Sequence, residues 1–141
     1  MTRMELGPHW TRPGDGDAVR YQRDDTVVNL QLQRCVSGRL RDAYPVGAHD
    51  VEVRVVNDVA AQDIVTPLAE LTDAIQAADP QCRRVVFAVH AGHTAMLTAA
   101  QAAGFRHVVD VDIPGAELSL LVAEPQWVTR VDADVQHVPG S

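Results

Sequence analysis

One stretch of the sequence constrains the fold more than any other, residues 85–105 with the sequence VVFAVHAGHTAMLTAAQAAGF. The largely apolar run from Arg84 to His90 is typical of a strand that is covered on both faces. From about His93 to Ala103 the residues predict a helix, one side of which carries Met96, Leu97, Ala100 and Ala103. Gly104 can supply the left-handed cap that ends this helix, and Phe105 follows directly. The stretch therefore predicts a buried strand that leads into a helix.

The remaining periodic segments predict more strands and a second helix. Apolar and polar residues alternate in 26–33 and in 51–55, which is the period of a strand with one wet face. Residues 18–23 are expected to pair with 26–33 as a hairpin. Apolar residues recur at helical spacing from 64 to 78. Residues 106–123 predict two antiparallel strands, because Pro-Gly in their middle is a strong turn signal.

This order predicts a single α/β domain with a mixed α+β sheet, in the order β-β-β-α-β-α-β-β. The 141 residues suffice for one core. Residues 1–17 hold two prolines and three glycines and are expected to form an irregular arm before a core at 18–123. Residues 124–141 are expected to form a tail. Residues 35–50 predict a long polar connection, either functional or a plain surface crossing.

Composition limits the function classes. The net charge of -7 argues against a nucleic-acid partner and suits a cationic substrate. All basic residues are arginines, which excludes chemistry that uses a lysine Schiff base. Cys35 and Cys82 fit no metal or redox spacing and indicate reduced thiols in the cytoplasm. The chain shows neither a signal core nor a run of the ~20 apolar residues that a membrane helix needs, so no membrane association is expected.

Several polar residues invite a catalytic or metal reading. His90, His93 and His107 are spaced like metal ligands, but a site needs three or four converging ligands, so no metal is expected. Asp110 and Asp112 share one face of a strand, where paired carboxylates can act in acid-base chemistry or can simply be solvated. The sequence contains neither a nucleophile elbow nor a phosphate-binding loop.

The order of elements from Val51 to Ala123, together with the strand-helix-Gly-Phe run, resembles the C-terminal half of the GCN5-related N-acetyltransferase (GNAT) fold. The resemblance implies an N-acyltransferase that moves an acetyl or other acyl group from acyl-coenzyme A to a primary amine. The acceptor would be a small molecule or a protein. The cofactor would lie where the strands at 51–56 and 85–89 splay apart.

The resemblance also implies roles for particular residues. In the family the cofactor's pyrophosphate sits on free amides at the start of the helix after the fourth strand. The corresponding candidates here are Val56, Asn57, Ala60, Ala61, Gln62 and Asp63, and His93 could hydrogen-bond the cofactor from the next helix. The amide of Val56 or Asn57 would stabilise the oxyanion. Glu52 is a candidate general base, with simple solvent exposure as the alternative.

The sequence departs from the family pattern at three places. Residues 56–66 contain no glycine, and Asp58 and Asp63 would repel phosphate. Ala100 stands where the family often has the tyrosine that protonates the departing thiolate. The front of the domain is shortened. These departures leave a second hypothesis, a non-catalytic domain on the same scaffold that binds a ligand, regulates or forms a homodimer through exposed strand edges.

Overall fold

A computed structural model of the chain describes residues 6–12, 17–43 and 45–124. The strands are β1 (Trp10–Thr11), β2 (Ala18–Arg23), β3 (Thr26–Arg34), β4 (Val51–Val55), β5 (Val85–His90), β6 (Arg106–Ile113) and β7 (Ala116–Ala123). The helices are α1 (Val65–Ala78) and α2 (Thr94–Ala102). Two short 3-10 helices, η1 (Cys35–Ser37) and η2 (Ala61–Ile64), complete the secondary structure.

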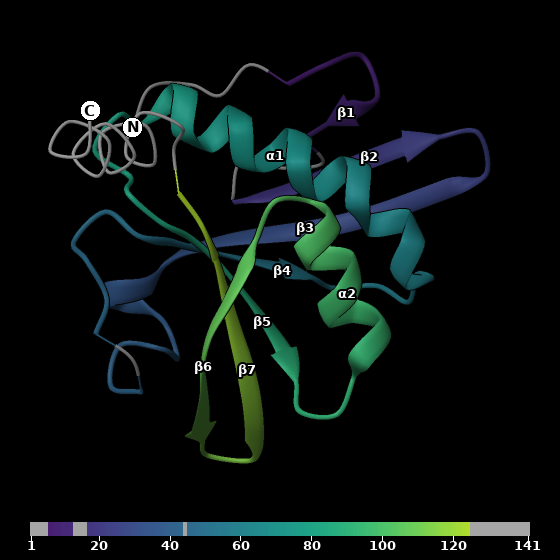
Figure 1. The fold of residues 1–141 in the computed structure, drawn as a ribbon. Helices are drawn as coiled ribbons and strands as arrows, with labels where there is room; N and C mark the ends of the chain where they lie inside the picture. The colour runs from purple at the N-terminus through teal and green to yellow at the C-terminus, as the bar shows by residue number, and fades with distance from the viewer. Residues whose placement is uncertain (1–5, 13–16, 44, 125–141) are drawn as a thin grey trace, which may run out of the picture.

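All of these strands belong to one sheet, in the order β1-β2-β3-β4-β5-β7-β6 (Figure 1). Strands β4 and β5 run parallel, and every other neighbouring pair is antiparallel. The parallel pair is possible because α1 provides the crossover between its strands. The predicted mixed sheet with two helices is therefore confirmed.

Helices α1 and α2 cover the same face of the sheet (Figure 1). The helical spacing of Leu68, Leu71 and Ile75 places all three side chains in this core, where none is exposed. They pack with Leu30 and other alternating residues of the strands. Burying one such side chain stabilises the fold by about 1.5–3 kcal/mol. This face holds most of the hydrophobic core.

The opposite face of the sheet is covered by residues 35–43 and 45–50, which we call the covering segment. Leu40 is fully buried and packs with Cys35, Val86 and Leu120. The sequence predicted a long polar connection here, and one apolar side chain among polar neighbours gave no periodic signal of burial. Both faces of the central strands are consequently covered.

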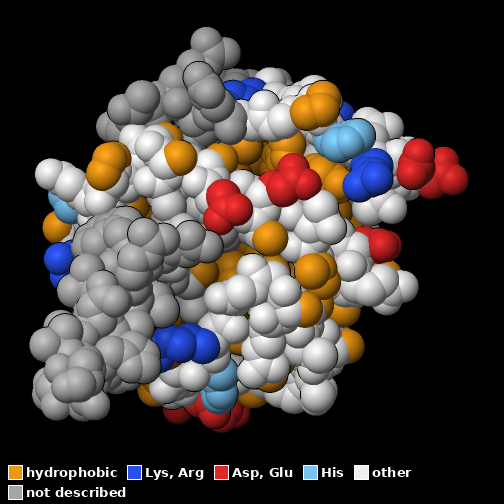
Figure 2. All heavy atoms as spheres, turned by 45° about the horizontal axis from the view of Figure 1, so that its top comes forward, with side chains coloured by type: hydrophobic (Ala, Val, Ile, Leu, Met, Phe, Trp, Pro, Cys, Tyr) orange, Lys and Arg blue, Asp and Glu red, His pale blue; other side chains and the backbone are white. Residues whose placement is uncertain are grey.

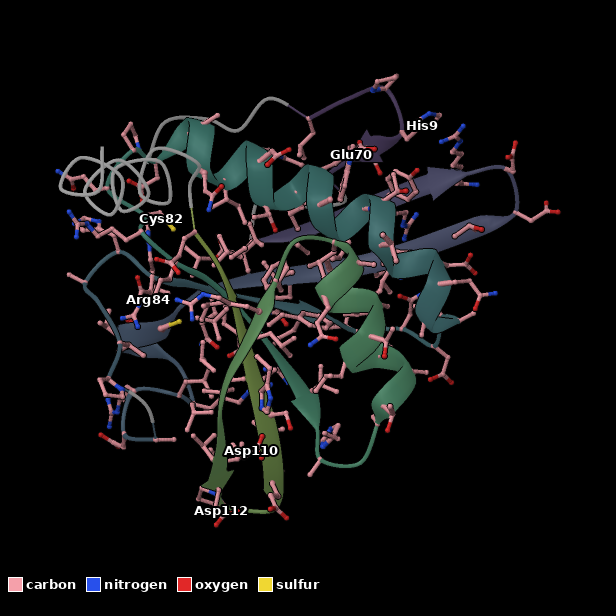
Figure 3. The ribbon with its side chains drawn as sticks, in the orientation of Figure 1. His9, Glu70, Cys82, Arg84, Asp110 and Asp112 are labelled. Atoms are coloured by element: carbon pink, nitrogen blue, oxygen red, sulfur yellow. The ribbon has the colours of Figure 1, made fainter. Side chains whose placement is uncertain are left out.

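Three ion pairs of 2.7 Å surround the covering segment: Arg34 with Asp79, Arg39 with Glu52, and Arg84 with Asp50. In each pair the carboxylate is nearly buried and the arginine is about a third exposed or less. Figure 3 shows Arg84 and Cys82 near the start of β5, on the side where the covering segment lies. These carboxylates, close to an apolar core, are compensated by opposite charge.

The prediction of an irregular arm at residues 1–17 is wrong at Trp10–Thr11. These residues form β1 and pair with Tyr21 and Arg20 of β2. The Trp10 indole is buried, and its Nε1 donates to Glu70 Oε1 at 3.1 Å. A two-residue strand is too short to show a period, so the sequence pattern could not reveal it. The predicted tail beyond Glu124 lies outside the described residues.

The surface around α1 carries mixed charge. Figure 2, turned so that the α1 side comes forward, shows carboxylates and basic side chains scattered among apolar ones. Within the described residues, no helix is both long and apolar enough to cross a membrane.

Candidate functional site

The parallel pairing between β4 and β5 stops partway along both strands. It joins Val51 with Val85, Glu52 with Val86, and Val53 with Phe87. Beyond these pairs, β4 remains bonded to β3 and β5 remains bonded to β7. The two strands therefore diverge in the middle of the sheet (Figure 1), and we call the region between their diverging ends the opening.

A cavity of about 180 Å³ lies in this opening and is lined by residues from both faces of the sheet; we call it the splay cavity. Successive strand residues point to opposite faces. The helix side is lined by Val55, Phe87, Val89, His93 and Met96. The side of the covering segment is lined by Arg39, Arg54, Ala88 and His90.

The backbone of β4 directs one free amide into this opening. Val51 N donates to Arg84 O at 3.2 Å, on the β5 side, whereas Val56 N donates to Asn29 O at 2.9 Å, on the β3 side. Amides alternate between the two sides along a strand. The N–H of Val55 therefore faces the β5 side, beyond the last β4–β5 pair. It points to where a carbonyl oxygen in the cavity would lie.

The oxyanion role predicted for Val56 does not fit this geometry, whereas the role of the Asn57 amide stays a prediction. The Val56 amide is already used by β3, although the Val56 side chain is exposed. The Asn57 side chain also ties the chain to β3, since its Oδ1 accepts from Asn29 N at 2.8 Å and its Nδ2 donates to Val27 O at 2.9 Å. The sequence does not reveal which neighbour lies on which side of β4, so it could not show that the Val56 amide is used by β3.

Glu52 is buried, contrary to the expected solvent exposure. It is 1% exposed and lies on the face opposite the helices. Its Oε2 accepts from Arg39 Nη2 at 2.7 Å and from Arg39 Nε at 3.2 Å. Strand alternation placed Glu52 on the correct face, but only the covering segment makes that face a buried one. Glu52 holds Arg39 in place rather than facing water.

The predicted phosphate-binding residues form a tight helix start. Ala60 precedes η2, and Asp63 N donates to Ala60 O at 2.9 Å. Helix η2 runs directly into α1, so the amides of Ala61 and Gln62 are the first of a long helical run. Asp63 places a carboxylate in the first turn, where it opposes a bound anion.

These residues do not line the splay cavity. Gln62 and Asp63 line a separate hollow of about 170 Å³, together with Arg23 and Thr66. The structure therefore divides the predicted cofactor residues between two places. His93 lies at the splay cavity, and the η2 residues lie beside the β2–β3 turn.

His93 caps the start of α2 at the rim of the splay cavity. Its Nδ1 accepts from Met96 N at 3.4 Å. A neutral ring that accepts at Nδ1 carries its proton on Nε2, which leaves one N–H donor for a ligand. His90, at the end of β5, lines the same cavity and is exposed.

The other polar candidates lie apart. Asp110 and Asp112 are exposed on β6 near its turn (Figure 3). Hydrogen bonds from Ser119 and from His107, whose Nε2 is 2.8 Å from the carboxylate, lower the pKa of Asp110. Within residues 6–12, 17–43 and 45–124, no three His, Cys, Asp or Glu side chains are grouped to hold a metal ion.

The comparisons with known proteins place the fold. A search against solved structures matches an uncharacterised protein from Bacillus halodurans with a TM-score of 0.69 at 14% identity, over 91% of this chain and 65% of that one. It also matches the aminoglycoside acetyltransferase AAC(6')-Ib in complex with coenzyme A and kanamycin, with a TM-score of 0.64 at 12% identity, over 82% of this chain and 71% of that one. The chain has the GNAT fold.

The GNAT fold is shown by structure alone. No protein-family model matches the sequence, and no curated protein sequence matches it significantly. AAC(6')-Ib with acetyl-coenzyme A gives a TM-score of 0.62 over 82% of this chain. The chain spans somewhat less than two thirds of the Bacillus halodurans protein and about 70% of AAC(6')-Ib.

Two further features bear on the site. Ala100, on α2, is fully buried in the core and offers no hydroxyl to the opening. A larger cavity of about 620 Å³ lies between the covering segment and the β6–β7 turn, and Arg39 lines both it and the splay cavity. No sequence pattern predicted this second cavity, because it is formed by segments far apart in the chain.

Proposed function

We propose that the chain is an N-acyltransferase that moves an acetyl or other acyl group from acyl-coenzyme A to a primary amine. The observation that carries the proposal is the opening between β4 and β5, with the Val55 N–H directed into it. Its helix side is lined by apolar Val89 and Met96, which suit a slender thioester chain. Acyl-coenzyme A would supply an activated thioester carbonyl there.

The residues of the opening divide the work of acyl transfer. The Val55 N–H would donate to the carbonyl oxygen as negative charge develops on it, a general device of acyl transfer. The His93 Nε2–H would hydrogen-bond the cofactor. Because Glu52 is held by Arg39, the exposed His90 is the better acceptor for the amine proton, directly or through water.

The first experiment is a calorimetric titration of acetyl-coenzyme A. Ala88→Leu would extend a side chain into the splay cavity and should weaken binding at least tenfold. Ala95→Leu, on the exposed side of α2, is the matched control and should leave binding unchanged. No heat at millimolar cofactor would refute the proposal.

A second variant tests the helix start. Ala61→Glu adds a carboxylate beside Asp63, so it should abolish binding if the phosphates rest on the first amides of η2. Unchanged binding would place the phosphates elsewhere, with the hollow beside Arg23 as the next candidate.

A non-catalytic domain is the second candidate, and buried Ala100 favours it because the usual proton donor for the thiolate is missing. Such a domain would bind acetyl-coenzyme A without acetylating any amine in a mass-spectrometric screen. We further propose a cytoplasmic protein, consistent with two buried free thiols, and a homodimer that pairs the edge strand β6. Sedimentation at micromolar concentration tests the dimer.

A further inference from the structure

Arg39 occupies a special place because it lines both the splay cavity and the larger cavity beside the β6–β7 turn. It comes from the covering segment, whereas the other side chains of the splay cavity come from β4, β5 and α2 or its start. A ligand that extends from one cavity into the other must pass its guanidinium. Arg39 can therefore contact both the reacting end and the outer end of a substrate.

The guanidinium of Arg39 is held in place, but not all of its N–H donors are used. Its Nε and Nη2 both donate to Glu52, whose carboxylate is 1% exposed. Nη1 has no partner among the described residues, and no buried side-chain nitrogen or oxygen there is left unsatisfied, so Nη1 is open to solvent. The Arg39 side chain as a whole is 27% exposed. Glu52 thus holds a donor in a set orientation at the junction of the two cavities.

The charge of the splay cavity is opposite to that of the whole chain. The chain carries a net charge of -7, yet the charged residues that line this cavity are Arg39 and Arg54, accompanied by two histidines. No carboxylate lines it among the described residues. Fixed positive charge within low-dielectric walls favours an anionic group on a ligand.

The larger cavity has a different character. Asp42 and Asp112 lie at its polar edge, and Ile113, Pro114 and Ala116 give it an apolar part. Arg41 also lines this cavity and pairs with Asp42 at 3.5 Å, whereas Asp112 adds a second carboxylate. Apart from Arg39, the larger cavity therefore carries one more carboxylate than guanidinium, so it accepts a neutral or cationic group while a ligand carboxylate is directed to Arg39.

From this arrangement we infer that the amine acceptor is an α-amino acid, held through its carboxylate by Arg39. The inference rests on the proposed function for the fate of the amine, but the binding of the carboxylate stands on its own. In an α-amino acid the amine and the carboxylate share one carbon. A carboxylate on Nη1 therefore keeps the amine beside the opening where Val55 N–H points, while the side chain extends into the larger cavity.

An α-amino acid differs from two other kinds of amine acceptor. Kanamycin, bound by AAC(6')-Ib, carries several amines and no carboxylate. A peptide N-terminus has an amide where a free amino acid has its carboxylate. Neither would form an ion pair with the guanidinium of Arg39.

The test compares each amino acid with its α-carboxamide, which keeps the amine and the side chain but removes the anion. Leucine with leucinamide and arginine with argininamide are titrated into ¹⁵N-labelled protein by NMR, with and without coenzyme A. The acid should bind about tenfold to a hundredfold tighter than the carboxamide, the range for a hydrogen bond to a charged group.

The decisive variant is Arg39→Gln combined with Glu52→Gln. It removes both charges together, so no buried carboxylate is left without a partner. The preference for the acid should fall to about onefold in this double variant. Arg34→Gln is the matched control, because Arg34 also pairs at 2.7 Å with a nearly buried carboxylate but lines neither cavity, and it should keep the preference.

Three outcomes of the NMR titrations would overturn the inference: no binding of either acid at millimolar concentration, equal binding of acid and carboxamide, or tighter binding of the carboxamide. The last would mean that the ammonium displaces Arg39 and pairs with Glu52. A loss of coenzyme A affinity in the double variant would also overturn it, by assigning Arg39 to the cofactor phosphates. Acid preference without acetyl-coenzyme A binding would instead refute only the proposed transferase.

Discussion

The pair of Arg39 and Glu52 should be strongly coupled in folding stability. The two side chains meet at 2.7 Å, with Glu52 1% exposed and Arg39 27% exposed. The perturbation is a double-mutant cycle of Arg39→Gln, Glu52→Gln and both together. Its reference is the pair of Arg41 and Asp42, which meets at 3.5 Å with side chains 64% and 90% exposed.

The expected loss of stability in each variant depends on which charge remains at the site. Arg39→Gln leaves the Glu52 carboxylate buried without compensation, which costs about 3 kcal/mol, the lower end of the range for breaking a buried pair, because Arg39 is partly hydrated. Glu52→Gln leaves an arginine that can turn to water, at a cost of about 1–2 kcal/mol. The double variant removes both charges and should cost about 1 kcal/mol, so the coupling energy is about 3 kcal/mol. The exposed reference pair should show no measurable coupling.

Urea unfolding followed by circular dichroism measures the cycle. With a urea dependence of about 1.5 kcal/mol per molar, Arg39→Gln should lower the midpoint by about 2 M. A coupling energy below about 0.5 kcal/mol would refute the reasoning, because it would mean that water reaches Glu52 despite the covering segment.

Three further outcomes are expected. Burial raises the pKa of Cys35 to about 12 and that of Cys82 to about 11, so Ellman's reagent should leave both thiols unmodified at neutral pH until the protein unfolds. Burial alone would raise the pKa of Asp79, but the hydrogen bond and charge of Arg34 hold it below 3.8. The stabilisation that ionised Asp79 provides should therefore be fully present above pH 3.8, and it should be lost as the pH falls through the lower pKa of the folded state. Arg34→Gln should weaken this loss of stability at acidic pH, as measured by urea titrations over a pH series. Leu30→Ala, at a fully buried position, should cost about 2–5 kcal/mol in the same assay.

Periodicity predicted the fold where segments were long enough to show it. The alternation in residues 26–33 and the helical spacing in residues 64–78 both correspond to elements of the structure. Pro114 and Gly115 form the predicted turn, with Gly115 at φ +86°. Trp10 escaped because two residues carry no period, and its place depends on the distant Glu70.

The candidate site was harder to predict because it depends on which strands neighbour β4 and on the covering segment that packs over it. The sequence placed Glu52 on one face of its strand, but the burial of Glu52 comes from Arg39 and the covering segment. The free amide belongs to Val55 rather than to Val56, since strand order decides which side of β4 faces the opening. His93 was correctly placed at a helix start, where its local sequence sets its position.

Only three residue pairs join β4 to β5, and these pairs connect the two halves of the sheet. On one side β1 to β4 form a nearly continuous antiparallel ribbon, and on the other side β5, β7 and β6 form a second one. A small rotation of one half of the sheet relative to the other would break few hydrogen bonds, because the β4–β5 pairing is so short. The width of the opening could then change while each antiparallel half stays intact. A molecule that contacts both halves of the sheet at once would then restrict their relative motion and make the whole domain more rigid.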